Sequence, residues 1–169
     1  MTFEFWVDTG ADTCCIGGGF LVLSKTGRYT TLRGYSDTGA EESVPIVTGA
    51  TAVDVKGITY ILIINEALYL GSQQHTSLLD LNQVRNAGHQ ADDIPHFLAR
   101  QPSIFGIDTV DGIHIPFQLK GKSALLYVRT PTTSEMENCR HIELTSSTPW
   151  DPAGADWQTT ETAFESSHI

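Results

Sequence analysis

Hydrophobic and polar side chains alternate with a period of two along much of residues 1–130, which is the pattern of half-buried β-strands. The first such run is short and well defined. Phe3, Phe5 and Val7 occupy alternate positions, and the run ends at Asp8. The pattern therefore predicts a strand over residues 3–7 that delivers a carboxylate at its exit.

Two β-hairpins are predicted further along the chain. Residues 43–55 and 58–70 form extended runs rich in Thr, Val and Ile, and the residues between them favour a turn. The second run contains the nearly continuous apolar sequence YILIIN, which indicates a central strand covered on both faces. Residues 113–119 and 123–129 predict another hairpin in the same way.

One short helix interrupts this β pattern. Ser77 is predicted to cap it, with Asp80 three residues later as in a capping box. Apolar side chains spaced by three then share one face, and Gly88 is suited to end the helix in the left-handed conformation.

Composition narrows the class of protein. The chain has 169 residues, the length of one domain or of one domain with a tail, and 40% of them are hydrophobic. A net charge of −10 argues against nucleic acid as the main partner, and no apolar run is long enough for a membrane helix. The acidic N-terminus is unlike a signal peptide, and three cysteines make no disulfide framework. We expect a soluble, intracellular protein, in the cytoplasm rather than secreted.

The C-terminal part differs in character from the rest. No Lys or Arg follows Arg140, whereas five acidic residues do, among many Ser, Thr and Pro. We therefore expect a folded domain over residues 1–130 and a disordered tail over residues 131–169. Trp150, Trp157 and Phe164 are candidate anchors for a partner, but a plain polyprotein linker is the favoured interpretation of this tail.

The sequence FWVDTGADTCCI over residues 5–16 contains the candidate catalytic residues. A carboxylate at the end of an apolar strand needs donors around it, and Thr9 offers a hydroxyl while Gly10 allows close backbone approach. Such an arrangement suits a carboxylate that activates water. The same tripeptide recurs at residues 37–39 within GYSDTGAEES, whose polar and turn-forming neighbours predict a solvated loop tip instead. Asp8 is therefore preferred to Asp37 as the catalytic group.

In this context the chain resembles the retropepsins, the aspartic proteases of retroviruses and retrotransposons. The pattern EALYL followed by SLLDLNQVRNAG is most similar to the copia-type branch, and the resemblance covers roughly residues 3–130. It implies an all-β fold: a closed β-barrel with a flap hairpin, one short helix and a homodimeric active site. It also implies an endopeptidase that processes a retrotransposon polyprotein, with water activated between two aspartates.

The resemblance also assigns the site residues. Asp8, Thr9 and Gly10 are expected to be catalytic, with Asp8 of each subunit meeting on a twofold axis because the chain offers one credible motif. The substrate-binding flap is expected to comprise six residues, namely Gly34, Tyr35, Ser36, Asp37, Thr38 and Gly39. The implied partners are a second copy and a polypeptide substrate, with no cofactor and no metal.

Two departures from the family keep a second hypothesis open. Asp80 stands where retropepsins usually have Gly, and the predicted flap is acidic rather than rich in glycine and apolar residues. These departures favour a catalytically silent β domain, either a dimerisation or binding module or a relic.

Other site chemistries find less support. The adjacent Cys14 and Cys15, the isolated Cys139 and six histidines lack the spacing of zinc ligands. Residues 17–19 are three consecutive glycines but lack the Lys-Ser/Thr of a phosphate-binding loop, which favours a flexible turn. There is no Gly-x-Ser-x-Gly element for a serine hydrolase.

Overall fold

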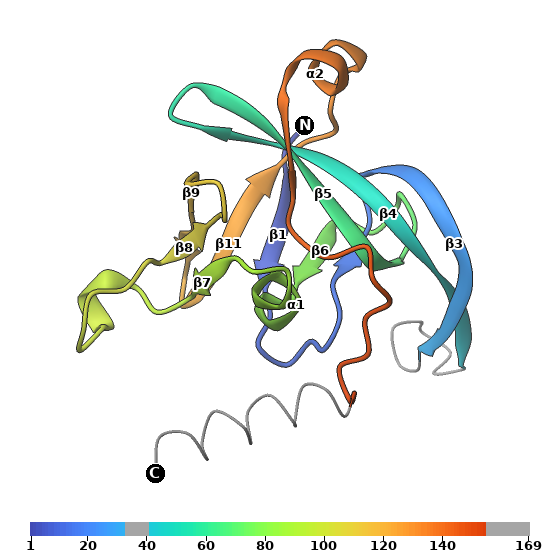
Figure 1. Cartoon of the computed structure of the whole chain (residues 1–169), viewed down its shortest axis with the longest axis horizontal. Helices are drawn as coiled ribbons and strands as arrows, with labels where there is room; N and C mark the ends of the chain where they lie inside the picture. The colour runs from blue at the N-terminus through green and yellow to red at the C-terminus, as the bar shows by residue number, and fades with distance from the viewer. Residues whose placement is uncertain (33–40, 155–169) are drawn as a thin grey trace.

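The computed structural model describes residues 1–32 and 41–154, and most of this part is β structure. Nine strands of the described chain form one large sheet (Figure 1). They are β1 (Phe3–Val7), β2 (Cys15–Ile16), β3 (Leu21–Leu32), β4 (Glu42–Val55), β5 (Ile58–Tyr69), β6 (Thr76–Leu79), β10 (Gln118–Lys120), β11 (Ser123–Val128) and β12 (Arg140–Glu143). A second sheet contains β7 (Gln90–Asp92), β8 (Gly106–Asp108) and β9 (His114–Pro116).

The strand order of the large sheet is β10-β11-β1-β6-β2-β5-β4-β3, with β12 paired to β5. The predicted all-β class is therefore correct at the level of a mostly β fold, but the predicted closed barrel is wrong, because β10 and β3 remain as edges. A single isolated bridge in the described chain, between Ala52 and Arg129, links β4 to the residue after β11. Pro131 follows shortly and has no N–H to continue such pairing, so the chain turns away before the sheet can close.

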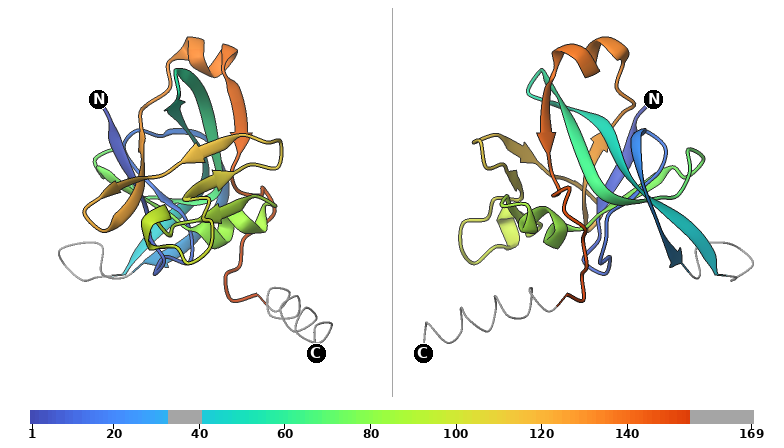
Figure 2. Two further views of the ribbon diagram at one scale, coloured as in Figure 1. Left: turned by 90° about the vertical axis from the view of Figure 1, so that its left-hand side faces the viewer. Right: turned by 45° about the vertical axis from the view of Figure 1, so that its right-hand side comes forward.

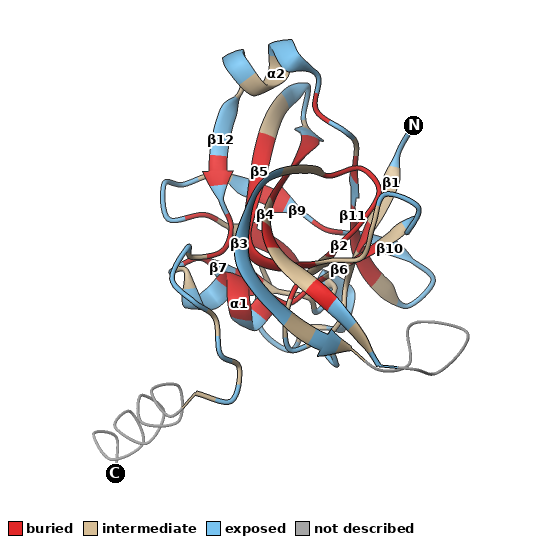
Figure 3. Cartoon of the chain, turned by 90° about the vertical axis from the view of Figure 1, so that its right-hand side faces the viewer, coloured by how far each residue is buried: buried red, intermediate tan, exposed pale blue. Residues whose placement is uncertain are grey.

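The predicted strand over residues 3–7 is confirmed as β1, and the first predicted hairpin as β4 and β5, paired from Val55–Ile58 up to Ile46–Leu68. β5 is central, because it also pairs with β2 and β12 and its residues 61–68 are buried. The second hairpin is confirmed in shorter form as β10 and β11, since β9 belongs to the other sheet. Figure 3 shows the buried residues on the inner strands and the exposed outer strand β3.

Two α-helices, not one, occur in the described chain: α1 (Leu81–Asn86) and α2 (Thr133–Asn138). A 3-10 turn, η1 (His96–Leu98), adds a third short helical element. Asp80 rather than Ser77 caps α1, because Ser77 belongs to β6 and its side chain is buried there. Gly88 has a φ of 99°, which confirms the left-handed conformation predicted after the helix.

The start of the expected disordered tail is also misplaced. Within residues 131–154, α2 caps one end of the molecule and β12 then runs parallel to β5 (Figures 1 and 2). Ile142 and Leu144 are buried in the main core cluster. β12 pairs with residues 60–63 of β5, a stretch that is not paired with β2, which pairs with residues 68–69. Residues 131–145 are therefore part of the folded domain. Residues 155–169, with Trp157 and Phe164, lie outside the described residues.

Candidate functional site

Asp8 lies where β1 leaves the sheet. β1 is held between β11 on one side and β6 on the other, with Val7 paired to Leu79. The backbone N–H of Asp8 then donates to the carbonyl oxygen of Leu79 at 3.2 Å, so pairing extends one residue beyond the strand. Two strands thus fix the backbone that carries the Asp8 carboxylate, as expected for a group held ready on a rigid element.

The loop after Asp8 is organised by the carboxylate itself. The Gly10 N–H donates to Asp8 Oδ1 at 2.8 Å, and the Ala11 N–H donates to the Asp8 carbonyl oxygen at 3.2 Å. A Cβ added to Gly10 would lie 3.3 Å from Oδ1, which explains the preference for glycine at this close approach. The Thr9 side chain is exposed, and no hydrogen bond from it to Asp8 is found in the described chain, so the expected hydroxyl donor is replaced by a backbone one.

Asp8 lines two pockets at the end of β1. The smaller has a volume of about 160 Å³, and its lining includes Asp80, Arg85 and Asp93. The larger has a volume of about 480 Å³ and runs along β1 and β6 between Glu4 and Asp8. Asp8 is half-buried, and no hydrogen bond in the described chain occupies its Oδ2. This oxygen is the one available to a water molecule.

Asp80 is the unusual member of the smaller pocket. Only 3% of its surface is exposed; Oδ1 accepts from the Asn82 N–H at 3.0 Å as the helix cap, and Oδ2 has no partner in the described chain. Burial raises the pKa of the Asp80 carboxyl, opposed by the N–H groups at the start of α1.

Replacing Asp80 with asparagine should remove the loss of folding stability that the buried carboxyl causes as pH rises. Because the folded state raises the pKa of Asp80, its contribution is fully present below the ordinary carboxyl pKa and is lost as pH rises through the raised value. An asparagine at this position would keep the cap but carry no charge. The free energy of unfolding of Asp80→Asn minus that of the wild type should therefore increase between pH 4 and pH 8. Urea unfolding at several pH values measures it, and a difference that stays flat with pH would contradict this assignment.

All six expected flap residues, Gly34 to Gly39, lie outside the described residues. The strands that flank them are described: β3 and β4 pair antiparallel, and their last pair before residues 33–40 is Leu32 with Glu42. The expected flap role of Asp37 and its neighbours thus stays a prediction.

The three consecutive glycines form a turn, as predicted, in which the Phe20 N–H donates to the Gly17 carbonyl oxygen at 3.3 Å. Residues 17–19 are buried, and the N–H groups of Gly17 and Gly18 donate to Ser77 Oγ and to the Gln74 carbonyl oxygen, at 3.0 and 2.7 Å. A Cβ on Gly18 would lie 2.7 Å from the Phe3 ring. The glycines therefore allow the backbone after β2 to pack tightly against β1 and β6.

Sequence reasoning missed the part that Gln83 plays. This buried side chain of α1 accepts from the Cys14 N–H at 2.9 Å and donates to the carbonyl oxygens of Asn65 and Glu66, at 3.2 and 3.1 Å. It thereby joins α1 to the end of the Asp8 loop and to β5. The signal available in the sequence was a polar residue on the apolar face of the helix, next to Val84.

Cysteine and histidine side chains do not form a competing site in the described chain. No group of three or more His, Cys, Asp and Glu side chains there could hold a metal ion. Burial raises the pKa of the Cys14 thiol, and burial together with nearby carboxylates raises that of Cys15 to about 11, so neither is an activated nucleophile at neutral pH. All three cysteines are free.

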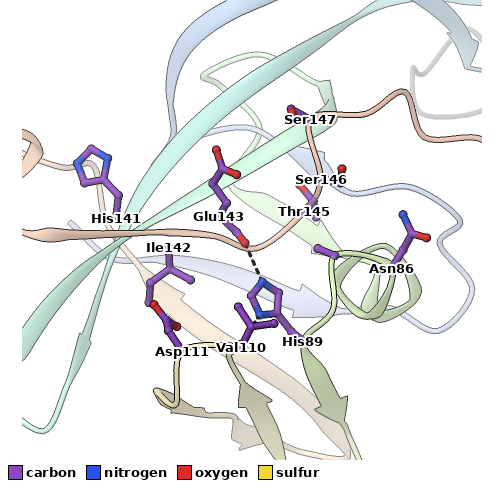
Figure 4. A pocket seen from close by; sticks show the side chains of 11 residues that line it. Asn86, His89, Val110, Asp111, His141, Ile142, Glu143, Thr145, Ser146 and Ser147 are labelled. Carbon is purple, nitrogen blue, oxygen red and sulfur yellow. Dashed lines mark hydrogen bonds between the residues drawn. The ribbon is translucent and has the colours of Figure 1, made fainter.

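A further pocket, of about 370 Å³, lies between α1 and β12 (Figure 4). His89 is buried there with both ring nitrogens engaged: Nε2 contacts the Glu143 carbonyl oxygen at 2.7 Å, and Nδ1 accepts from the Val110 N–H at 3.1 Å. The His141 and Glu143 side chains point to the other side of β12 (Figure 4). The titratable groups of this pocket therefore do not converge on one point. His89 serves to attach β12 to the rest of the domain.

Comparison of the chain with protein-family models, with curated proteins and with solved structures found no match. In the described part, no helix has both the length and the hydropathy needed to cross a bilayer.

Proposed function

We propose that this protein is an aspartic endopeptidase of the retropepsin type, active as a homodimer that brings the Asp8 carboxylates of two subunits together. The observation that carries the proposal is the geometry of Asp8. Its backbone is fixed by β6, one carboxylate oxygen is held by the Gly10 N–H at 2.8 Å, and the residue lines two pockets. A carboxylate in such a setting is suited to hold and activate water.

Asp80 does not supply the second carboxylate of a single-chain pair. Its Oδ1 caps α1, and its Oδ2 is inaccessible to solvent, so neither oxygen can meet a water molecule that a substrate could reach. A twofold dimer solves the problem with one motif, because each subunit then contributes an identical group.

The chemistry needs the two carboxylates to share one proton. Two like charges about 3 Å apart do not both ionise, so one carboxylate acts as base toward the water while the other donates a hydrogen bond to the scissile carbonyl oxygen. The substrate is a polypeptide, and the retrotransposon resemblance makes the polyprotein that contains this domain the expected one. The rate should be bell-shaped in pH, with both limbs belonging to the pair of carboxylates.

Dimerisation should be weak and visible in the kinetics. Each subunit carries a net charge of −10, so two copies repel one another at low ionic strength. Activity per chain on a peptide library should rise with enzyme concentration and with salt until the dimer is saturated. Sedimentation under the same conditions gives the oligomeric state.

Mixing experiments separate this proposal from the silent-module hypothesis. An equal mixture of wild type and Asp8→Asn should show about half the activity of the same amount of wild type alone, since random pairing places half of the wild-type chains in mixed dimers. Full activity from a strict monomer would contradict the shared pair. A dimer that cleaves none of the peptides would favour the binding module.

A further inference from the structure

The segment after β12 returns to the loop that follows Asp8. We call residues 146–154 the C-terminal strap. In Figures 1 and 2 it is drawn in red and descends from β12 toward the end of the sheet where that loop lies. The Trp150 indole Nε1–H donates to the carbonyl oxygen of Asp12 at 2.8 Å, across 138 positions of sequence. Asp12 belongs to the same loop as Asp8, so the strap contacts the backbone of the candidate site.

A second contact fixes the backbone of Trp150. Its N–H donates to Glu66 Oε1 at 3.0 Å, and the other oxygen of that carboxylate pairs with Arg28 of β3. Glu66 is only 4% exposed and has a φ of 54°, in a bulge where Asn65 and Glu66 stand opposite Thr48 of β4. A buried carboxylate is costly unless donors surround it, and the positive φ adds a backbone cost that the surrounding structure must also offset. Glu66 therefore joins β3, β5 and the strap.

The strap starts from a fixed point. Thr145, fully buried, donates through Oγ1 to the Asn65 carbonyl oxygen and accepts from the Asn65 N–H, both at 2.7 Å. The Asn65 side-chain amide donates to the Thr145 carbonyl oxygen at 2.8 Å. The chain between Thr145 and Trp150 is thus held at both ends by the bulge of β5.

The strap forms one wall of a pocket that borders the far end of the Asp8 loop, at Asp12, and it does not line the pockets at Asp8 itself. This pocket, of about 370 Å³, lies between the loop, the paired strands β3 and β4, β5 and the strap. Its lining includes Asp12, Leu32, Ile46, Trp150 and Pro152, whereas no strap residue lines either pocket that contains Asp8. An inhibitory segment would occupy the space at the carboxylate, so this arrangement argues against an inhibitory role for residues 146–154.

We infer that one residue of the C-terminal strap, Trp150, serves the proposed active site as a positioning residue that fixes the Asp8 loop through the Asp12 carbonyl oxygen. The expected effect on catalysis rests on the proposed function. The hydrogen bond between Trp150 and Asp12 does not depend on that function. The catalytic unit then extends to Trp150, beyond the 1–130 span of the family resemblance. Removing the contact lets the loop sample other conformations, and misplacement of a catalytic group lowers turnover.

Trp150→Phe tests the inference, because phenylalanine keeps an aromatic ring but removes the indole N–H. We expect kcat to fall about tenfold, as for the loss of one well-placed hydrogen bond, with a smaller change in KM. Amide hydrogen exchange at residues 9–13 should become faster, while β1 and β6 keep their protection. Ser147→Ala, an exposed strap position, is the matched control and should change neither quantity.

The two readouts separate the two proposals. If the wild type cleaves no peptide, the proposed function fails, and the exchange rates of residues 9–13 still decide whether Trp150 holds the loop. If the wild type is active and Trp150→Phe leaves both kcat and loop exchange unchanged, the strap inference is wrong. A variant that loses activity only in proportion to a loss of folded protein would also overturn it, since that is a stability effect alone.

Discussion

Asp8→Asn is expected to abolish peptide cleavage while leaving the fold intact. Asparagine is nearly isosteric with aspartate, and its side-chain oxygen can still accept from the Gly10 N–H that Oδ1 binds at 2.8 Å. What is lost is the group that takes a proton from water, and positioned proton transfer contributes on the order of 10²- to 10⁴-fold. Initial rates on a fluorogenic peptide mixture at acidic pH, with circular dichroism as the check on folding, measure the effect.

Two other aspartates provide the controls. Asp37→Asn tests the second Asp-Thr-Gly tripeptide and should keep most of the activity. Asp93→Asn tests the other half-buried acid in the smaller pocket beside Asp8, and it should also remain active. An inactive Asp37→Asn would mean that the two tripeptides have been assigned the wrong way round. An inactive Asp93→Asn would point to a pair of carboxylates within one chain.

The features that sequence predicted well are local ones. β1, the turn between β4 and β5, and the left-handed Gly88 each follow from the chemistry of a few neighbouring residues. The placement of Asp8 at the exit of an inner strand follows in the same way, because the alternation of apolar residues stops there. Such signals need no knowledge of what packs against the segment.

Contacts between distant segments decided the features that were predicted wrongly. Ser77 has the right chemistry for a helix cap, but β6 pairs with β1 through this position and uses its hydroxyl to bind the Gly17 N–H, so the helix begins after Asp80. The contact between Trp150 and Asp12 joins residues 138 positions apart, and no local pattern contains it. Tertiary pairing overrides local propensity at both places.

The folded residues 131–145, by contrast, could have been predicted, because the sequence contains local signals for both α2 and β12. Thr132 and Glu135 form a full capping box, with Thr132 Oγ1 accepting from the Glu135 N–H at 3.1 Å and the Glu135 carboxylate accepting from the Thr132 N–H at 2.9 Å. Ile142 and Leu144 then alternate with polar residues. The acidic, Ser- and Thr-rich composition concealed both signals, since it describes an average over a segment whose first part is folded.

Ending the chain at residue 130 is expected to prevent stable folding, although that boundary matches the extent of the family resemblance. The truncation removes β12 from the side of β5, and with it Ile142 and Leu144, which are 3% and 0% exposed. Burial of each such side chain contributes about 1.5–3 kcal/mol. The Thr145 hydrogen bonds to Asn65 add about 1 kcal/mol each. The sum for the two side chains and the three hydrogen bonds, about 6–9 kcal/mol, is comparable with the whole stability of many domains.

The truncation also breaks a charged connection at the other end of the molecule. Arg129 donates to Asp54 of β4 and to Glu135 of α2, and the Arg129 guanidinium lowers the pKa of Glu135 to about 2. Without α2, Arg129 keeps only its contacts with the β4/β5 hairpin. We therefore expect residues 1–130 to aggregate or to show no cooperative unfolding transition.

A chain ending at residue 154 is the matched control, because it keeps every contact described above, including those of Trp150. Thermal unfolding followed by near-ultraviolet circular dichroism should give a single sharp transition for 1–154. A chain ending at 145 should lie between the two, since it retains β12 and Thr145 but loses the strap contacts to Glu66 and Asp12. If 1–130 unfolds as cooperatively as 1–154, then residues 131–145 are not needed for folding, and the domain ends at residue 130 as the sequence predicted.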